Sequence, residues 1–439
     1  MIQISVINAL LLVPFFSAGT GAQKITARGL PAVGSAAVRV CSAEQALPLA
    51  TEAGALEERE SSRTSPDEEE RDKDKNGSDS AVTAIPRAFD LSEAEPIASL
   101  AGAQAMERGL LFLSTQLATS KDGSLPCTSG AFYAPVGVTA LGALAFMAAG
   151  NTPGRGPHAK SLERTISYLL ARVTPDSEAG LGYVQDEADG HSRMHGHGLA
   201  TLALAQAYGI SPNSGRGARI AEALVAATAC IERAQSFEGG WYYDPRPGNE
   251  HEGSITVCVL QALRAASEAG ISVDPKVITL AIEYLKRLQV EAGGFQYALN
   301  QPQTTVALTA ACLSSLQAAG IYDSNAVHDG YGYIWRELVL RQEARARGLM
   351  AQEPRFPFYE RFYLSQALWQ HPKESEFRRW APEEIRRVIT SQEEDGSWRD
   401  VRHEEKSKRS QGRYGRSYAT AMNCLFLALP EGILPIFQR

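Results

Sequence analysis

Two short segments hold ionisable side chains whose spacing could do chemistry. His195 and His197 lie two positions apart, so both imidazoles could reach one metal ion from an extended loop, whereas in a helix they would not share a face. Glu250 and Glu252 precede an apolar run that starts near Ser254, where a carboxylate can cap a helix or can donate a proton or stabilise a cation. We favour local hydrogen bonding for the histidines and capping for the glutamates, and both alternatives stay open.

The elements that position these residues follow a pattern that the chain repeats. Apolar residues recur at spacings of three and four, the helix period, in runs that are separated by glycine turns. Three of the turns share the pattern Gln, three residues, Gly, any residue, then Trp or Phe. They comprise Gln235, Gly239, Gly240 and Trp241; Gln289, Gly293, Gly294 and Phe295; and Gln392, Gly396 and Trp398. Degenerate copies occur at 122–125 and 180–183, and the copy expected near residue 350 has lost its glycine turn.

The runs on the two sides of each turn differ in polarity, which predicts two rings of helices. The run after a turn is apolar nearly all round, as a buried inner helix must be, whereas the run before it keeps a polar face. About six such hairpins fill residues 96–439. An open stack of hairpins would leave one inner face exposed, so we predict an all-α fold that closes into an α/α toroid.

Closing the toroid would bring the loops after the glycine turns to one mouth, beside the N-termini of the inner helices. Helix N-termini favour anionic groups, so this mouth is the predicted functional site. The candidate mouth-lining residues are Asp189, His195, His197, Asp244, Glu250, His251, Glu252, Tyr359, Arg361, His403 and Arg413. The sequence does not assign a catalytic residue among them, and we expect no metal ligand set.

The turns also resemble those of known families. The Gln-to-aromatic pattern resembles the QW motif of squalene and oxidosqualene cyclases, and the Gly-Gly-aromatic turns resemble those of protein prenyltransferase β subunits. The stretches from Met194 and from Tyr418 are similar to bacterial prenyltransferase/squalene-oxidase-repeat proteins of the planctomycete type. The resemblance covers about residues 96–439. It implies an α/α toroid and a hydrophobic or isoprenoid ligand. The rings of Tyr359, Phe362, Tyr363 and Trp369 could line a cavity for such a ligand and stabilise its cations, although we favour ordinary packing for them.

The catalytic motifs of these families are missing from the sequence. There is no DxDD and no DDxxD, and the zinc-binding Asp-x-Cys has no counterpart, since Cys258 lies six residues after Glu252. We therefore expect a toroid that binds a ligand or a protein partner without a cofactor. An isoprenoid cyclase or transferase with a divergent site is the alternative. A carbohydrate-active toroid, which needs a carboxylate pair across its cavity, is the third hypothesis.

Composition bounds the remaining functions and the N-terminal region. The net charge is -7, and residues 52–80 alone carry eleven acidic and five basic residues. No basic stripe interleaves with aromatic residues, which excludes an evident nucleic-acid surface.

We predict an export signal over residues 1–22 and a low-pattern, acidic, disordered linker over 23–95. A disordered or misassigned start is the alternative to the signal. No other run is long enough for an integral membrane domain.

Overall fold

The computed structural model describes residues 100–128, 132–174, 182–211, 213, 215–349, 353–404, 407–411 and 413–438. The export signal expected at 1–22 and the linker expected at 23–95 lie outside these ranges. Within the ranges, no helix combines the length and the apolar composition that crossing a bilayer requires.

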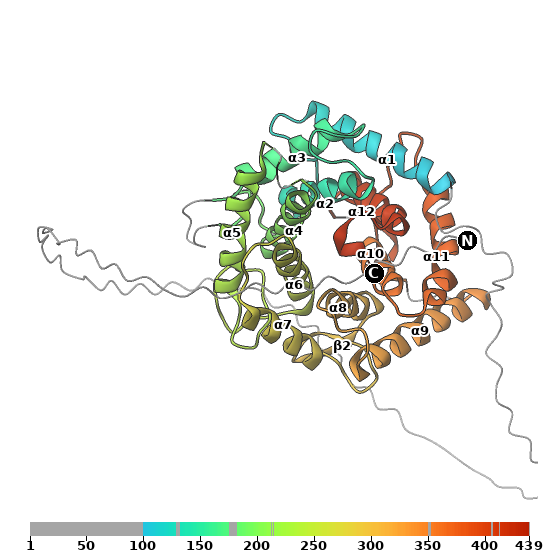
Figure 1. Cartoon of the computed structure of the whole chain (residues 1–439). Helices are drawn as coiled ribbons and strands as arrows, with labels where there is room; N and C mark the ends of the chain where they lie inside the picture. The colour runs from blue at the N-terminus through green and yellow to red at the C-terminus, as the bar shows by residue number, and fades with distance from the viewer. Residues whose placement is uncertain are drawn as a thin grey trace, which may run out of the picture. The chain divides into compact units, whose positions relative to one another are not determined.

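Twelve α-helices in this part of the chain form two concentric rings (Figure 1). The outer ring consists of α1 (Leu100–Thr119), α3 (Ala159–Ala171), α5 (Gly217–Ala234), α7 (Pro275–Arg287), α9 (Asn325–Ala346) and α11 (Glu374–Thr390). The inner ring consists of α2 (Pro135–Ala148), α4 (Met194–Ile210), α6 (Gly253–Glu268), α8 (Val306–Ala318), α10 (Pro357–Trp369) and α12 (Arg416–Ala428). Each inner helix contacts the next, and α12 packs back against α2. The predicted all-α, α/α-toroid fold is confirmed.

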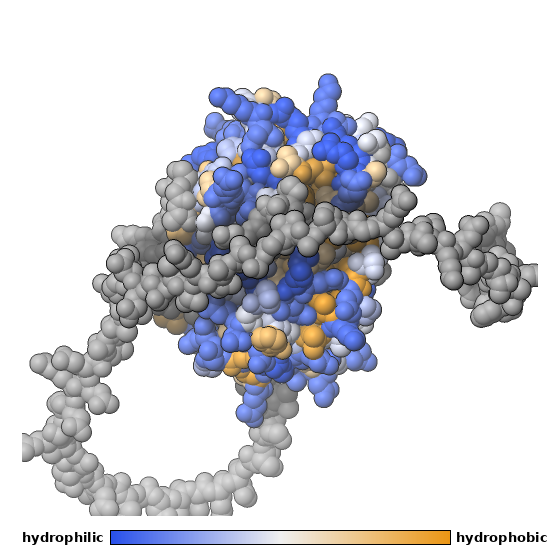
Figure 2. All heavy atoms as spheres, turned by 90° about the vertical axis from the view of Figure 1, so that its left-hand side faces the viewer, coloured by the Kyte–Doolittle hydropathy of each residue, from blue (hydrophilic) through white to orange (hydrophobic). Residues whose placement is uncertain are grey.

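Hydrophobic patterning explains which helix takes which ring. Every residue of α2 is buried, because an inner helix has neighbours on all sides. In α7 the buried residues are Val277, Ala281, Tyr284 and Leu285, which form one stripe at helical spacing. The outer surface on the α5 side is accordingly mostly hydrophilic, with smaller apolar patches (Figure 2).

Small elements complete the fold. Strands β1 (Gln296–Ala298) and β2 (Gln301–Thr304) pair antiparallel between α7 and α8, and β3 (Val401–Glu404) pairs with β4 (Ser407–Gln411) before α12. Two 3₁₀ turns, η3 (Leu429–Glu431) and η4 (Pro435–Phe437), follow α12.

The glycine turns fasten each hairpin to the next one. Gly239 has a φ of 91°, and a Cβ atom there would lie 2.5 Å from the carbonyl oxygen of Leu280 on α7, so only glycine fits. The side-chain amide of Gln235 donates to the carbonyl of Gly239 and also to that of Val277 on α7, both at 2.9 Å. The motif glutamine is therefore a clamp between hairpins as well as a support for its own turn.

The last of these clamps closes the ring. Gln392 donates to the carbonyl of its own Gly396 at 2.9 Å and to that of Ala105 on α1 at 2.8 Å. These bonds join α1 to the turn after α11, across nearly the whole described chain.

The end of the barrel away from the glycine turns is sealed by the C-terminal segment. The indole N–H of Trp369 donates to the carbonyl of Phe437 at 2.7 Å, and Gln370 donates to that of Ile436 at 3.1 Å. The side chains of Leu434 and Phe437 are buried there. The C-terminal segment therefore covers the end of the toroid opposite the inner-helix N-termini.

Candidate functional site

One hydrogen bond sets the rotation of the inner helices and so decides which residues face the axis. The backbone N–H of the aromatic turn residue donates to a threonine hydroxyl in the first turns of the inner helix that follows, as Trp241 does to Thr256 at 3.0 Å. Thr139, Thr309 and Thr420 accept the corresponding bonds in their hairpins. These threonines face the wall between the rings, so a residue two positions earlier turns toward the axis.

His197 takes the place of this threonine in α4. Its Nδ1 accepts the N–H of Val184 at 3.0 Å, and its Nε2 donates to the carbonyl of Ala227 at 3.2 Å. The side chain is fully buried, and burial lowers its pKa to about 4, so the imidazole is neutral at pH 7. Both ring nitrogens are occupied inside the wall, which leaves no nitrogen to bind a ligand at the mouth.

His195, two residues earlier, faces the axis. The equivalent positions are Gly137, Ser254, Ala307, Tyr359 and Tyr418, and of the six residues, His195 included, all but Gly137 keep partial solvent exposure on helices that are otherwise largely buried. The His195 ring meets the Tyr359 ring edge-on, with centroids 6.4 Å apart. Burial, with a smaller contribution from His191, lowers the pKa of His195 to about 4. The axial mouth therefore carries a neutral imidazole.

Glu252 is the N-cap of α6, and its charge acts on the Tyr359 and Tyr363 hydroxyls of this mouth. It accepts the N–H groups of Ser254 at 2.8 Å and of Ile255 at 2.6 Å, and it is fully buried. Burial raises its pKa to about 7, although these bonds and one from Tyr297 oppose the rise. Burial and the nearby Glu252 charge both raise the pKa of Tyr297. Glu252 is thus a structural cap that is part protonated near pH 7.

Aromatic rings line the mouth around these groups. Tyr359 packs on Tyr363 with centroids 4.7 Å apart, and Tyr418 packs on Tyr414 at 5.0 Å and on Phe358 at 5.9 Å. The phenol oxygen of Tyr359 is buried and has no hydrogen-bond partner in the described part of the chain. An unpaired buried hydroxyl is costly, so a water or a ligand group is needed to satisfy it.

The other candidates take structural positions or lie toward the surface. Asp189 accepts the N–H groups of His191 and Ser192, and Asp244 pairs with Arg246 at 2.9 Å. Glu250 is exposed, His251 shares a 2.9 Å hydrogen bond with the Tyr284 hydroxyl, and Arg413 lies over the Phe132 ring. The side chain of His403, in β3, lies outside the described residues.

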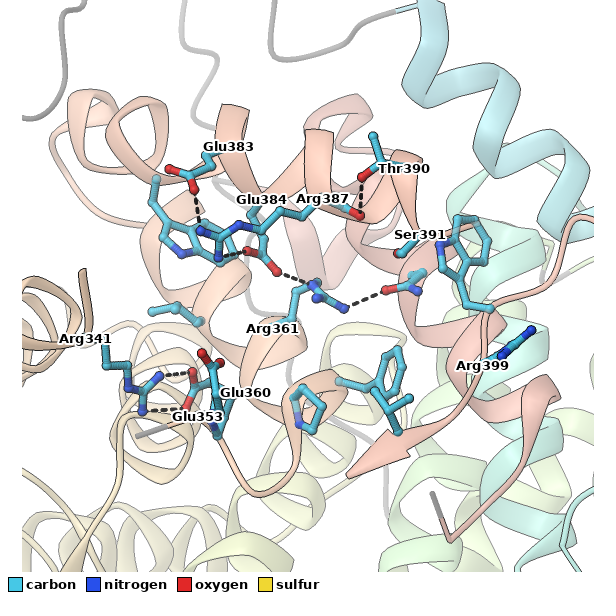
Figure 3. A pocket seen from close by; sticks show the side chains of 18 of the residues that line it. Arg341, Glu353, Glu360, Arg361, Glu383, Glu384, Arg387, Thr390, Ser391 and Arg399 are labelled. Atoms are coloured by element: carbon cyan, nitrogen blue, oxygen red, sulfur yellow. Dashed lines mark hydrogen bonds and ion pairs between the residues drawn. The ribbon is translucent and has the colours of Figure 1, made fainter. Parts of the chain in front are cut away.

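Arg361 points away from the axis into a pocket in the wall of the toroid. It is two residues after Tyr359, so it occupies the wall-facing position that threonine holds in other inner helices. Its guanidinium donates to Glu384 on α11 at 2.7 Å and to Asn423 on α12 at 2.8 Å (Figure 3). The pocket has a volume of about 1640 Å³ and lies between α9, α10 and α11.

The structure therefore brings His195 and Tyr359 together near the axis, with Tyr359 within electrostatic reach of Glu252, and separates His197 and Arg361 from them. Ser254, Tyr297 and Tyr418 belong to the mouth but were not predicted. A threonine follows the apolar turn residue by 14 or 15 positions at Leu125, Trp241 and Phe295, and this spacing would have located Ser254 and excluded His197. Among the described residues, no three His, Cys, Asp or Glu side chains are placed to hold a metal ion.

Comparison with known proteins supports the fold. No protein-family model matches the sequence, and no curated protein matches it either. Among solved structures, an inactive variant of the GH76A α-1,6-mannanase of Salegentibacter in complex with α-1,6-mannotriose has a TM-score of 0.50 at 12% identity, over 74% of this chain and 98% of that one. A point variant of the type II terpene cyclase MstE of Scytonema has a TM-score of 0.50 at 14% identity, over 76% and 98%. Cellobiose 2-epimerase of Bacillus thermoamylovorans has a TM-score of 0.50 at 11% identity, over 74% and 98%. At these identities the likeness extends to the toroid fold and not to the chemistry.

Proposed function

We propose that this protein is a binding toroid whose axial mouth holds an elongated apolar ligand that carries one hydrogen-bonding group. The observation that carries the proposal is the unpaired, buried hydroxyl of Tyr359, whose ring packs on Tyr363 and meets His195 edge-on. A mostly apolar wall with a few placed polar groups is the usual composition of a small-molecule site. His195 is neutral at pH 7, so the mouth favours a neutral polar group over a diphosphate.

An isoprenoid alcohol has this chemistry and is the ligand class that we propose. Its chain would lie against the aromatic rings, and its hydroxyl would accept or donate at Tyr359. The chain is flexible and apolar, so its affinity would come mainly from burial of hydrocarbon, about 0.8 kcal/mol for each CH₂ group.

The first experiment asks whether the purified protein carries or binds such a ligand. Solvent extraction followed by mass spectrometry identifies any co-purified lipid, and titration with geranylgeraniol measures binding directly. The mouth is blocked by Ala307→Trp, because Ala307 is one of the axis-facing first-turn residues. The matched control is Ala103→Trp on the exposed face of α1.

The proposal predicts saturable binding by the wild type and by the Ala103 variant, and a loss of at least roughly tenfold in the Ala307 variant. Equal affinity in all three proteins would assign binding to another surface. No binding at all by folded wild-type protein, with no lipid in the extract, would reject an isoprenoid ligand.

A second candidate function, an isoprenoid-processing enzyme, is favoured by Glu252. A carboxyl group that is part protonated at pH 7 can act as a general acid, and ring faces near it can stabilise a carbocation. Transfer of its proton to a carbon–carbon double bond would leave the Glu252 carboxylate and a carbocation, which the aromatic mouth would shield from water. Loss of a proton from a neighbouring carbon back to the carboxylate would then give an alkene isomer and restore the acid. Incubation with geranylgeraniol and gas chromatography would then reveal isomers of unchanged mass, which Glu252→Gln should abolish. Unchanged substrate after long incubation would leave binding as the function.

A further inference from the structure

The wall pocket lies where the ring of glycine turns is interrupted. At five places around the outer ring, a turn glycine packs on a main-chain carbonyl of the next outer helix, where a Cβ atom would lie between 2.0 and 2.8 Å from that oxygen. The pairs are Gly123 with Arg164, Gly182 with Ala226, Gly239 with Leu280, Gly293 with Asp329, and Gly396 with Arg108. The sixth place, between α9 and α11, has no such pair among the described residues. Gly348, the glycine after α9, has no atom within 4 Å of where its Cβ would lie.

The helix register identifies the surface that the missing turn would cover. Ala226 and Leu280, the residues contacted on α5 and α7, each precede the motif glutamine at the end of the same helix by nine residues. Nine residues before Gln392, the same position on α11 is Glu383, and Glu383 lines the wall pocket. Among the described residues, the pocket thus lies at the seat of a glycine–aromatic turn.

Ion pairs connect the three helices that form the walls of the seat. Arg341 on α9 donates to both carboxylate oxygens of Glu360 on α10, at 2.5 and 3.2 Å, and Arg361 joins α10 to Glu384 on α11 (Figure 3). Arg341 and Glu360 are mostly buried, with 14% and 8% of their side chains exposed. Such pairs have a fixed geometry, so they fix how α9, α10 and α11 are spaced around the seat.

The chemistry of the seat favours a peptide over a small charged metabolite. Seven arginines and seven carboxylates line it, so its formal net charge is zero. Its volume of about 1640 Å³ exceeds the roughly 300–1,000 Å³ that is usual for small-molecule sites. The indole N–H of Trp335 is buried in this wall without an acceptor among the described residues, whereas the indoles of Trp241 and Trp398 each donate to a carbonyl at 2.8 Å. A loop supplies the carbonyl oxygens that such donors need.

We propose that the wall pocket between α9 and α11 is a docking site for a glycine–aromatic loop of a partner protein, which inserts where this chain's own turns insert elsewhere. We take the occupant from another protein, because this chain's own copies of the motif are already used. The pattern of Gln, three residues, Gly, any residue and an aromatic occurs three times in the sequence, and its aromatics Trp241, Phe295 and Trp398 are all buried in their own hairpins. This site is distinct from the axial mouth and does not depend on the function proposed for it.

The test uses the chain's own turn as the probe. A fluorescent cyclic peptide of residues 234–243 presents Gly239, Gly240 and Trp241 in a constrained loop, which lowers the ordering cost of binding. Its anisotropy is titrated with the full-length protein and compared with that of the same peptide carrying Trp241→Ala. Val339→Trp fills the pocket, and Val225→Trp on the exposed face of α5 is the matched control. Circular dichroism melting selects variants that fold as the wild type does; if the Val339 variant does not, Leu338→Phe in the same wall replaces it.

Saturable binding of the Trp peptide by the wild type and the Val225 variant, weakened at least roughly tenfold in the filled pocket and in the Ala peptide, would support the proposal. No saturable binding up to about 1 mM, a limit of roughly 4 kcal/mol of binding free energy, would overturn it. The proposal would also be overturned if the Trp and Ala peptides bound the wild type equally well, or if the filled-pocket variant bound the Trp peptide as tightly as the wild type does.

Discussion

Replacing Gln392 by alanine tests whether the glutamine clamps hold the toroid closed. The side-chain amide of Gln392 donates two hydrogen bonds, to the carbonyls of Gly396 and Ala105, at 2.9 and 2.8 Å. Each neutral hydrogen bond contributes about 1 kcal/mol net, so the Gln392→Ala variant should lose about 2 kcal/mol of free energy of unfolding. Gln235→Ala removes the equivalent pair of donated bonds within consecutive hairpins. Because Gln392 also accepts a bond from the Arg108 guanidinium on α1, the Gln235 variant should cost about the same or less.

Urea unfolding followed by circular dichroism measures these differences, with the exposed Gln104→Ala on α1 as the control. Hydrogen exchange adds a local readout, because the Gln392 variant should lose protection on α1 and α11 while α5 and α7 keep theirs. A cost for Gln392→Ala no larger than that of the Gln104 control would refute the clamp. Loss of protection spread evenly over the ring would refute its assignment to the closing seam.

Three further variants test the turn and the two buried titrating groups. Gly239→Ala should cost at least about 2 kcal/mol more than Gly270→Ala, because both glycines have similar positive φ angles but only the first would meet a neighbouring carbonyl; equal costs would mean that the clash is unimportant. The raised pKa of Glu252 means that the folded state binds the extra proton, so the free energy of unfolding of the wild type should fall as pH rises from 4.5 to about 7. The fall should be steeper than in Glu252→Gln by up to ~1 kcal/mol per pH unit, and parallel pH profiles of the two proteins would contradict this. The lowered pKa of His197 has the opposite effect, because the unfolded state binds the extra proton. The free energy of unfolding of the wild type should therefore fall as pH falls from 6.5 to about 4, and His197→Thr should remove up to ~1.4 kcal/mol per pH unit of that slope. An unchanged slope would show that His197 titrates normally in the folded state.

The local parts of this fold were predictable from the sequence because they follow local rules. Helical spacing located the hairpins, and the polarity of each run assigned it to the outer or the inner ring. Glycine next to an aromatic residue marked the turns, because only glycine takes the positive φ that Gly239 adopts there. The helix N-terminus at residue 253 also made capping by Glu252 predictable.

The site was predictable only in part, because adjacent residues on a helix face different surroundings. His195 and His197 have the same type and lie in the same turn, yet one meets Tyr359 at the axis and the other is bonded between Val184 and Ala227. Because the two histidines are close in sequence, we expected one role for both. The bond from Val184 fixes the rotation of α4 about its own axis, and this rotation places the two side chains in different surroundings.

By itself, the sequence determined how many hairpins form, where each turns and which helix of each pair is buried, since those properties depend on residues close together in the chain. Tertiary structure alone decided that the motif glutamines clamp neighbouring hairpins, that Arg361 faces the wall, and that the place between α9 and α11 is left open as a pocket. Those outcomes require contacts among helices that closure of the ring brings together, and no local spacing rule encodes such contacts.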